Sequence, residues 1–334
     1  MIILGVDWSC PVVQTITLLG ATGVASVIFL VNLYCYFTCG QCTSKARMEG
    51  KTVIVTGANS GIGKETVRDL AKRGCRVIMA CRNLDTAKAV QEEIIKSTGN
   101  NSIILKKLDL SSQESIRAFA ADIIKTEPKL HVLVHNAGVA LAIRGAKSVD
   151  GVELTMATNH YGPFLLTHLL IDLLKNTAPA RIVVVASELY KLASVNLNNL
   201  NPLNTKPAAY LYYVSKYANI YFTRELARRL EGTGVTANCL HPGLVDSGIW
   251  RNVPFPLNYP VKLITRGFFK TLEQGAQTTI HLTVSDELKG VNGKYYMDCK
   301  EATLNRAAQD MEKARKLWEE SAKIVKLTKD DPKI

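Results

Sequence analysis

The stretch TVIVTGANSGIG, residues 52–63, decides the fold of this 334-residue chain. The β-branched run Thr52–Val55 predicts a buried strand, and the glycines at Gly57, Gly61 and Gly63 predict a tight turn that leads into a helix. Glycines let a backbone approach a ligand closely, and a helix N-terminus offers free N–H groups that suit a pyrophosphate. The spacing is GxxxGxG, which alone is a weak indication. Its place between a strand and a helix predicts a nucleotide site.

After Gly50 the chain alternates short apolar runs with longer helical patterns. The predicted strands are Thr52–Val55, Arg76–Met79, Ser102–Leu108, His131–His135, Arg181–Ala186 and Val235–Leu240. The predicted helices are Gly61–Arg73, Asp85–Ser97, Gln113–Thr126, Val152–Lys175, Tyr212–Leu230 and Leu304–Leu327. Strands joined by crossover helices favour a parallel sheet with both faces covered. We therefore expect an α/β fold, a Rossmann-type doubly wound parallel sheet, in one domain at 50–326. A tail at 327–334 is expected to fray at its end.

A second feature precedes this domain, because residues 11–44 carry no charged side chain. An apolar run of this length can cross a bilayer, for which about 20 residues suffice. Asp7 precedes the run and Lys45, Arg47 and Lys51 follow it, so the positive-inside rule places the body of the chain in the cytosol. The sequence thus predicts a single-pass protein with an N-terminal transmembrane helix, in the endoplasmic reticulum.

The predicted segments are a short lumenal N-terminus at 1–10, a transmembrane anchor at 11–39 and a juxtamembrane linker at 40–49. A cleaved leader and a hairpin within one leaflet stay open as alternatives. Three cysteines, Cys35, Cys39 and Cys42, lie at the expected membrane edge, where palmitoylation and unmodified thiols are both open.

The net charge of +12 requires nucleic acid to be considered as a partner. The basic residues are scattered, without a long Lys/Arg block, so an anionic cofactor and an anionic membrane surface explain the sign better. We expect no nucleic-acid partner. No set of the eight cysteines and six histidines has the spacing of a structural zinc site, so no metal is expected either.

The end of the second predicted strand, Ala80-Cys81-Arg82, bears on the type of nucleotide. An NAD-specific site usually has an acidic residue here for the ribose hydroxyls, whereas an arginine accommodates a 2′-phosphate. Arg82 is present without the acid, and Lys64 adds charge beside the glycines. The sequence therefore favours NADP(H) over NAD(H), although both cations could instead face solvent.

Further motifs follow the glycine-rich turn in a fixed order. They are Asp109, Asn136-Ala137-Gly138, Asn159, Ser187, the YxxxK pair Tyr212 and Lys216, and His241-Pro242-Gly243. Together they resemble the short-chain dehydrogenase/reductase family over about residues 50–325. CRN at 81–83, NHYGPFLLTHLL from Asn159, SKYAN from Ser215 and LWEESAKIV from Leu317 resemble its retinol dehydrogenase-like membrane reductases. Two positions depart from the usual pattern, with Ala186 where relatives often have Ser and Ser247 where they often have Thr.

The resemblance implies a cofactor site and a catalytic set. The implied cofactor-binding residues are Gly57, Asn59, Ser60, Gly61, Ile62, Gly63, Arg82, Asp109, Leu110, Asn136, Ala137, Gly138, Tyr212, Lys216, Pro242, Gly243, Val245 and Ser247. Asp109 would bind the adenine end, Asn136 would stabilise the sheet beside the cofactor, and His241–Ser247 would enclose the nicotinamide end. The implied catalytic residues are Asn159, Ser187, Tyr212 and Lys216.

Tyr212 and Lys216 are one helical turn apart and so share a helix face. A nearby ammonium favours the phenolate, and we expect it to lower the tyrosine pKa from its usual value near 10. Tyr212 would donate a proton to a carbonyl oxygen that Ser187 hydrogen-bonds, and Asn159 would hold a water in a relay towards Lys216. The predicted reaction interconverts a carbonyl and an alcohol.

The segment Gly248–Leu272 interrupts the alternation with aromatic and basic residues, and by its position it would cover a hydrophobic substrate. The subgroup resemblance suggests retinal or retinol. Steroids, fatty aldehydes and isoprenoid carbonyls stay open, as do a homodimer and a non-catalytic NADPH-binding membrane regulator.

Overall fold

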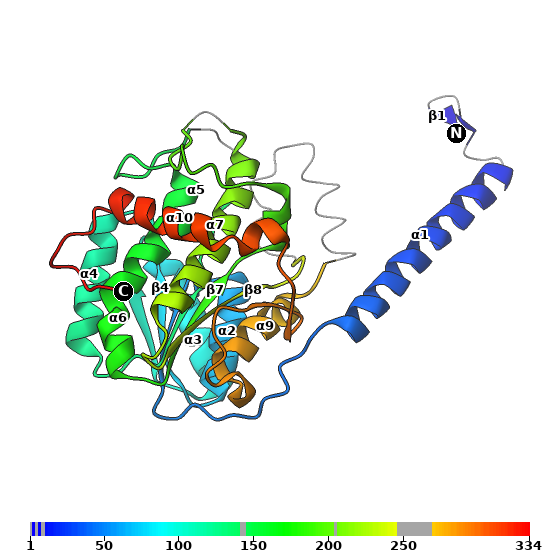
Figure 1. The fold of residues 1–334 in the computed structure, drawn as a ribbon. Coiled ribbons are helices and arrows are strands. Elements are labelled where there is room, and N and C mark those ends of the chain that lie inside the picture. Colours follow the sequence, from blue (N-terminus) through cyan, green and yellow to red (C-terminus); the bar gives the residue numbers. More distant parts are fainter. Residues whose placement is uncertain (1, 4–5, 8–10, 141–144, 204–205, 246–268) are drawn as a thin grey trace.

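A computed structural model describes residues 2–3, 6–7, 11–140, 145–203, 206–245 and 269–334. Ser247 and most of the predicted substrate-covering segment lie outside these ranges. Within them the chain forms a layered α/β body, from which the N-terminal helix α1 (Pro11–Thr38) projects (Figure 1).

The body is built on a mainly parallel sheet of eight strands in the order β10-β9-β8-β7-β6-β3-β4-β5. The strands are β3 (Thr52–Thr56), β4 (Arg76–Cys81), β5 (Ile103–Lys107), β6 (Val132–His135), β7 (Ala180–Val185), β8 (Val235–His241), β9 (Tyr295–Met297) and β10 (Lys300–Glu301). Only the hairpin β9–β10 pairs antiparallel within this sheet. The six predicted strands and the doubly wound order are confirmed. The order reverses between β3 and β6, and ligands bind such sheets at this switch point, beyond the carboxyl ends of the strands.

Helices cover both faces of the sheet, and the β3 side chains show why. Val53 and Val55 pack into one hydrophobic cluster while Ile54 packs into the other, because successive strand residues point to opposite faces. One face carries α2 (Gly61–Lys72), α3 (Leu84–Thr98) and α9 (Leu272–Val284). The other carries α4 (Gln113–Thr126), α6 (Gly162–Asn176), α7 (Ala208–Arg229) and α10 (Met311–Ile324). Helix α9 was not predicted.

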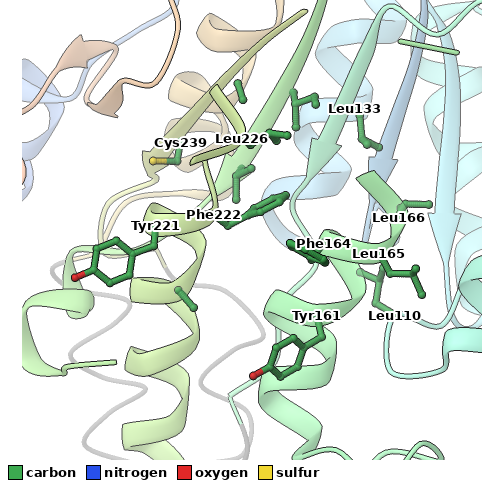
Figure 2. Close-up of a cluster of buried hydrophobic side chains, with 14 of the residues drawn as sticks. Leu110, Leu133, Tyr161, Phe164, Leu165, Leu166, Tyr221, Phe222, Leu226 and Cys239 are labelled. Carbon is green, nitrogen blue, oxygen red and sulfur yellow. The ribbon is translucent and has the colours of Figure 1, made fainter. Parts of the chain in front are cut away.

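An aromatic cluster fixes the helices that carry the candidate catalytic residues. Phe164 of α6 points toward Phe222 of α7, with ring centroids 5.7 Å apart (Figure 2). Trp318 of α10 lies 4.9 Å from Phe164 and stacks on Phe222 at 5.8 Å. Such pairs add to the burial of large apolar rings, so α7 rests on a well-packed support.

The predicted helix Val152–Lys175 is interrupted. A short helix α5 (Leu154–Met156) leads into a π-helical turn η1 (Ala157–Tyr161), and α6 follows directly. π-turns are rare and often occur at functional sites, and this one contains Asn159. Helix α7 also begins one turn earlier than predicted, at Ala208.

The helix α1 spans 28 residues, and Leu18, Leu19, Phe29 and Leu30 on it are 60–65% exposed. In the part of the chain that the structure describes, no helix reaches the length and apolarity needed to cross a membrane. A small hairpin of β1 (Ile2–Ile3) and β2 (Val6–Asp7) precedes α1.

The predicted linker does not hang free but packs along the body (Figure 1). Arg73 donates hydrogen bonds to the carbonyls of Ser44 and Ala46, at 2.8 and 2.9 Å. The amide of Cys42 donates to Gln277 Oε1 on α9 at 3.1 Å. Cys39, which has CxxC spacing with Cys42, is buried.

The expectation of a frayed C-terminus is wrong. Asp331 forms a two-pronged ion pair with Arg117 of α4, at 2.6 and 3.0 Å. The carbonyl of Lys333 accepts from Lys175 at 3.1 Å, and that of Ile334 accepts from Arg229 at 3.3 Å. The tail is therefore tied to three helices by contacts between residues far apart in the sequence.

Candidate active site

The glycine-rich turn lies at the switch point and follows β3 directly. Gly57 and Gly61 have φ values of +64° and +59°, in the left-handed region that favours glycine. A Cβ atom at Gly57 would lie 2.9 Å from Ala137 Cα, and one at Gly63 would collide with Asn136 Nδ2. The backbone here is thus as close-packed as a pyrophosphate site requires.

The first turn of α2 adds donors to this surface. Ser60 is the exposed N-cap residue, and its side chain makes no capping hydrogen bond. Asn59 is held in place by a 3.1 Å bond from its Nδ2 to Thr86 Oγ1 on α3. Because the first N–H groups of a helix lack intrahelical partners, this turn fits an anionic phosphate.

Thr56 joins the two strands that flank the switch point. Its Oγ1 accepts the backbone N–H groups of Asn136 and Ala137, both at 3.0 Å. The Asn136 side chain returns a bond from Nδ2 to the Thr56 carbonyl at 2.9 Å. The structure places Asn136 across both strands, where the resemblance expected it. Thr56 was not among the predicted site residues, because nothing in a strand-ending threonine indicates two backbone partners.

Asp109 and Leu110 follow β5 at the edge expected for the adenine. Oδ1 of Asp109 accepts the N–H and the Oγ–H of Ser111, at 2.9 and 2.7 Å. Leu110 is buried beneath α6, where a Cβ atom at Gly162 would collide with the Leu110 carbonyl. The loop is therefore held by its own short-range bonds and by a close helix contact.

The two predicted 2′-phosphate cations behave differently. Arg82 is exposed, and the structure shows no hydrogen bond or ion pair to its side chain among the described residues. Lys64 instead forms a 2.7 Å ion pair with Glu93, which also pairs with Arg68 at 2.7 Å. The charge that Lys64 was predicted to add beside the glycines is thus paired with Glu93, a residue 29 positions away.

The catalytic candidates converge where β7 ends beside α7. Ser187 follows β7 and is buried, and a side-chain hydrogen bond joins it to Tyr212. Lys216 Nζ lies 5.6 Å from the centroid of the Tyr212 ring and donates to the Val185 carbonyl at 2.8 Å. The Tyr212 ring also meets that of Tyr213 edge-on at 6.1 Å.

Burial sets the titration of this pair. It raises the pKa of Tyr212 to about 12, against a lowering by the hydrogen bond from Ser187. It lowers the pKa of Lys216 to about 8. The expected lowering of the tyrosine pKa by Lys216 is therefore wrong, because the loss of water around the phenol raises the pKa more than the neighbouring groups lower it.

Asn159 lies at the back of the site with both amide hydrogens engaged. Its Nδ2 donates to the Val139 carbonyl at 2.9 Å and to Ser215 Oγ at 3.0 Å, and its Oδ1 accepts the Val139 N–H at 2.8 Å. The Ser215 hydroxyl in turn donates a hydrogen bond to the Tyr212 carbonyl at 2.7 Å. A second lone pair on Oδ1 is left for a water. Oδ1 and Lys216 Nζ lie 3.6 and 3.3 Å from where a Cβ atom of Gly138 would be.

The loop after β8 closes the far side of the site. Gly243, which follows Pro242, has φ +95°, and the side chain of Lys270 lies over it. Val245 approaches the glycine-rich turn, because a Cβ atom at Gly275 would lie 2.6 Å from Val245 and 3.3 Å from Ile62. The structure thus brings the predicted residues at both ends of the cofactor site around one switch point.

The chain matches the short chain dehydrogenase family over residues 51–255. It belongs to that family. It is 41% identical to mouse retinol dehydrogenase 12 over 91% of this chain and 96% of the relative. It is 45% identical to mouse retinol dehydrogenase 14 over 84% and 88% of the two chains. A Beutenbergia cavernae structure, assigned as an NAD(P)-dependent gluconate 5-dehydrogenase with NADP bound at low occupancy, has a TM-score of 0.61 at 26% identity, covering 75% of this chain and 96% of its own.

This dehydrogenase is therefore a retinol dehydrogenase-like oxidoreductase that acts on CH–OH groups with a nicotinamide cofactor. The glycine turn and the free helix N-terminus fit the phosphates of such a cofactor, on the geometry given above.

Proposed function

We propose that this dehydrogenase interconverts a carbonyl and an alcohol on a retinoid-type lipophilic substrate with NADP(H). The observation that carries the proposal is the convergence of Ser187, Tyr212 and Lys216 beside the switch point. The substrate class rests on the retinol dehydrogenases that the chain resembles over most of its length.

The chain's own residues would handle the proton. When bound, the nicotinamide exchanges a hydride with the substrate carbon. During reduction the Tyr212 hydroxyl would donate its proton to the carbonyl oxygen, and Ser187 would hydrogen-bond the same oxygen. A pKa of about 12 keeps Tyr212 protonated at neutral pH, which is the form that reduction uses.

Lys216 and Asn159 would return the proton to Tyr212. With a pKa of about 8, Lys216 is largely protonated at pH 7 yet loses a proton readily. A water accepted by the free lone pair of Asn159 Oδ1 would lie near Lys216 Nζ, since both atoms face Gly138. Asn159 would act only as an acceptor in this relay, because both of its amide hydrogens are engaged.

The preference for NADP(H) over NAD(H) rests on Arg82. Its guanidinium is exposed at the end of β4, where the 2′-oxygen of the ribose is bound in this fold. An arginine can hold a phosphate through two parallel hydrogen bonds. NADP is also the cofactor in the Beutenbergia structure.

We also propose that the segment at 11–39 anchors the dehydrogenase in the endoplasmic reticulum membrane. The exposed apolar side chains of α1 support this, since a group of exposed apolar side chains on one helix is typical of an interaction site. Alkaline carbonate extraction should leave the full chain in the membrane pellet, and recovery in the supernatant would contradict an anchor. A homodimer stays a prediction that cross-linking in the same membranes can test.

The deciding experiment measures NADPH consumption by microsomes that contain the chain, against retinal, steroid ketones, fatty aldehydes and isoprenoid carbonyls. Tyr212→Phe should lower kcat at least about 100-fold without weakening NADPH binding, because only the proton donor is lost. Tyr213→Phe is the matched control, since Tyr213 adjoins Tyr212 without the bond to Ser187.

Turnover of retinal that depends on Tyr212 and is faster with NADPH than with NADH would support the proposal. Equal rates with the two cofactors would contradict the NADP(H) preference. Binding of NADPH without turnover of any carbonyl would favour a non-catalytic regulator.

A further inference from the structure

The turn between β9 and β10 has an unusual backbone. Asp298 and Cys299 are the two central residues of this hairpin, with φ values of +51° and +58°. Two-residue hairpin loops with two positive φ values usually contain Asn-Gly or Gly-Gly. Non-glycine residues in this region are strained, and such strain persists only where the surrounding structure holds it.

The Asp298 carboxylate joins two segments that are distant in the sequence. Its Oδ1 forms an ion pair with Lys270 Nζ and accepts the backbone N–H of Gly40 in the linker, at 3.3 Å. A Cβ atom at Gly40 would collide with the Asp298 backbone, so the close approach requires glycine there. The Lys270 side chain is 14% exposed and that of Asp298 is 33% exposed, so the pair is only partly solvated.

Lys270 in turn holds the loop after β8. Its N–H donates to the Leu244 carbonyl at 2.8 Å, and its Nζ lies 2.9 Å from where a Cβ atom of Gly243 would be. Val245, at the end of the same loop, and Ile62 in the glycine-rich turn both flank Gly275 of α9, at 2.6 and 3.3 Å from where a Cβ atom of that glycine would be. A continuous path of contacts thus runs from the linker through Asp298 and Lys270 to the cofactor side of the site.

From these contacts we infer that Asp298 is a positioning residue that couples the juxtamembrane linker to the loop 243–245 and so sets cofactor affinity. The inference rests on the proposed cofactor site but not on any substrate. Without the carboxylate, Lys270 loses its partner and the loop gains alternative conformations. If only a fraction of molecules keeps the binding-competent loop, the apparent Kd rises by the inverse of that fraction. The chemical step, which uses Tyr212, should change little.

The test uses the full chain in detergent and measures the NADPH Kd by fluorescence, beside kcat and KM. Asp298→Asn should raise Kd and the KM for NADPH about 5- to 20-fold and leave kcat within about threefold. Lys270→Gln should do the same, and it serves where Asp298→Asn folds poorly. Glu301→Gln is the matched control, because it breaks the exposed Lys294–Glu301 pair at the same hairpin and should leave Kd unchanged.

Gly40→Ala decides whether the linker takes part. It should raise Kd by itself, and combining it with Asp298→Asn should add little, since residues in one network are not additive. A normal Kd in both Asp298→Asn and Lys270→Gln, or equal loss in the Glu301→Gln control, would overturn the inference. The coupling to the linker would be overturned if Gly40→Ala left the Kd unchanged. It would also be overturned if the effects of Gly40→Ala and Asp298→Asn on the Kd were fully additive. Because Kd is read without turnover, these outcomes are distinct from failure of the proposed reaction.

Discussion

At the scale of single residues, spacing predicted proximity but not protonation. Tyr212 and Lys216 were expected to meet because they are four positions apart, and they do, with Lys216 Nζ 5.6 Å from the ring. Their titration is set instead by burial, which raises the pKa of Tyr212 and lowers that of Lys216. Both shifts favour the neutral form of the group. Burial comes from β7 and from loops far away in the sequence, so no local pattern could reveal it.

Arg82 and Lys64 give a test at this scale. Arg82→Gln should lower kcat/KM for NADPH about 10- to 100-fold and leave that for NADH nearly unchanged, because a charge-assisted bond to phosphate contributes about 1.5–3 kcal/mol. Lys64→Gln should change either value less than about threefold, since Glu93 already pairs with Lys64. Steady-state kinetics with both cofactors checks this. A larger loss of kcat/KM for NADPH in Lys64→Gln than in Arg82→Gln would mean that Lys64, and not Arg82, binds the 2′-phosphate.

At the scale of elements, strong periodic patterns were predicted well and short or polar ones were not. The central strands contain runs of apolar residues, and their positions were confirmed. The edge hairpin β9–β10 was missed because it has two or three residues a strand and is partly exposed. The π-turn at Ala157–Tyr161 has the same periodicity as an ordinary helix within the window that a pattern can read.

The C-terminal tail offers a test of an element. Asp331→Ala should lower the free energy of unfolding by about 1–3 kcal/mol, because it leaves Arg117 without its partner and frees the tail. Asp330→Ala is the neighbouring control and should have little effect. Urea titration followed by tryptophan fluorescence measures both. Equal losses would mean that the tail contributes nothing specific.

The pH dependence of the stabilisation by the Arg117–Asp331 ion pair follows from the Asp331 pKa. Arg117 lowers it to about 2, below the unfolded value of 3.8. The stabilisation is therefore present above pH 3.8 and is lost as the pH falls towards 2.

At the scale of the whole molecule, the packed interior holds several neutral histidines. Burial lowers the pKa of His135 to about 3 and those of His160, His168 and His241 to about 4. Each of these side chains is at most 6% exposed.

These histidines predict acid sensitivity. Their folded pKa values lie below the unfolded 6.5, so the stabilisation is complete above pH 6.5 and is lost as the pH falls towards 4. Denaturant titrations from pH 7 to 5 should show unfolding with an uptake of about two protons or more near pH 5.5. A free energy of unfolding that is independent of pH in this range would contradict the burial of neutral histidines.

By itself the sequence determined the α/β class, the positions of the six predicted strands and the glycine turn. These features are local, since they depend on the period of apolar residues and on conformations that only glycine adopts readily. Only the tertiary structure decided the protonation of Tyr212, the pairing of Lys64 with Glu93, the docking of the tail and the link from Gly40 through Asp298 to Lys270. Each of these depends on desolvation or on contacts across long stretches of chain, such as the 258 positions between Gly40 and Asp298.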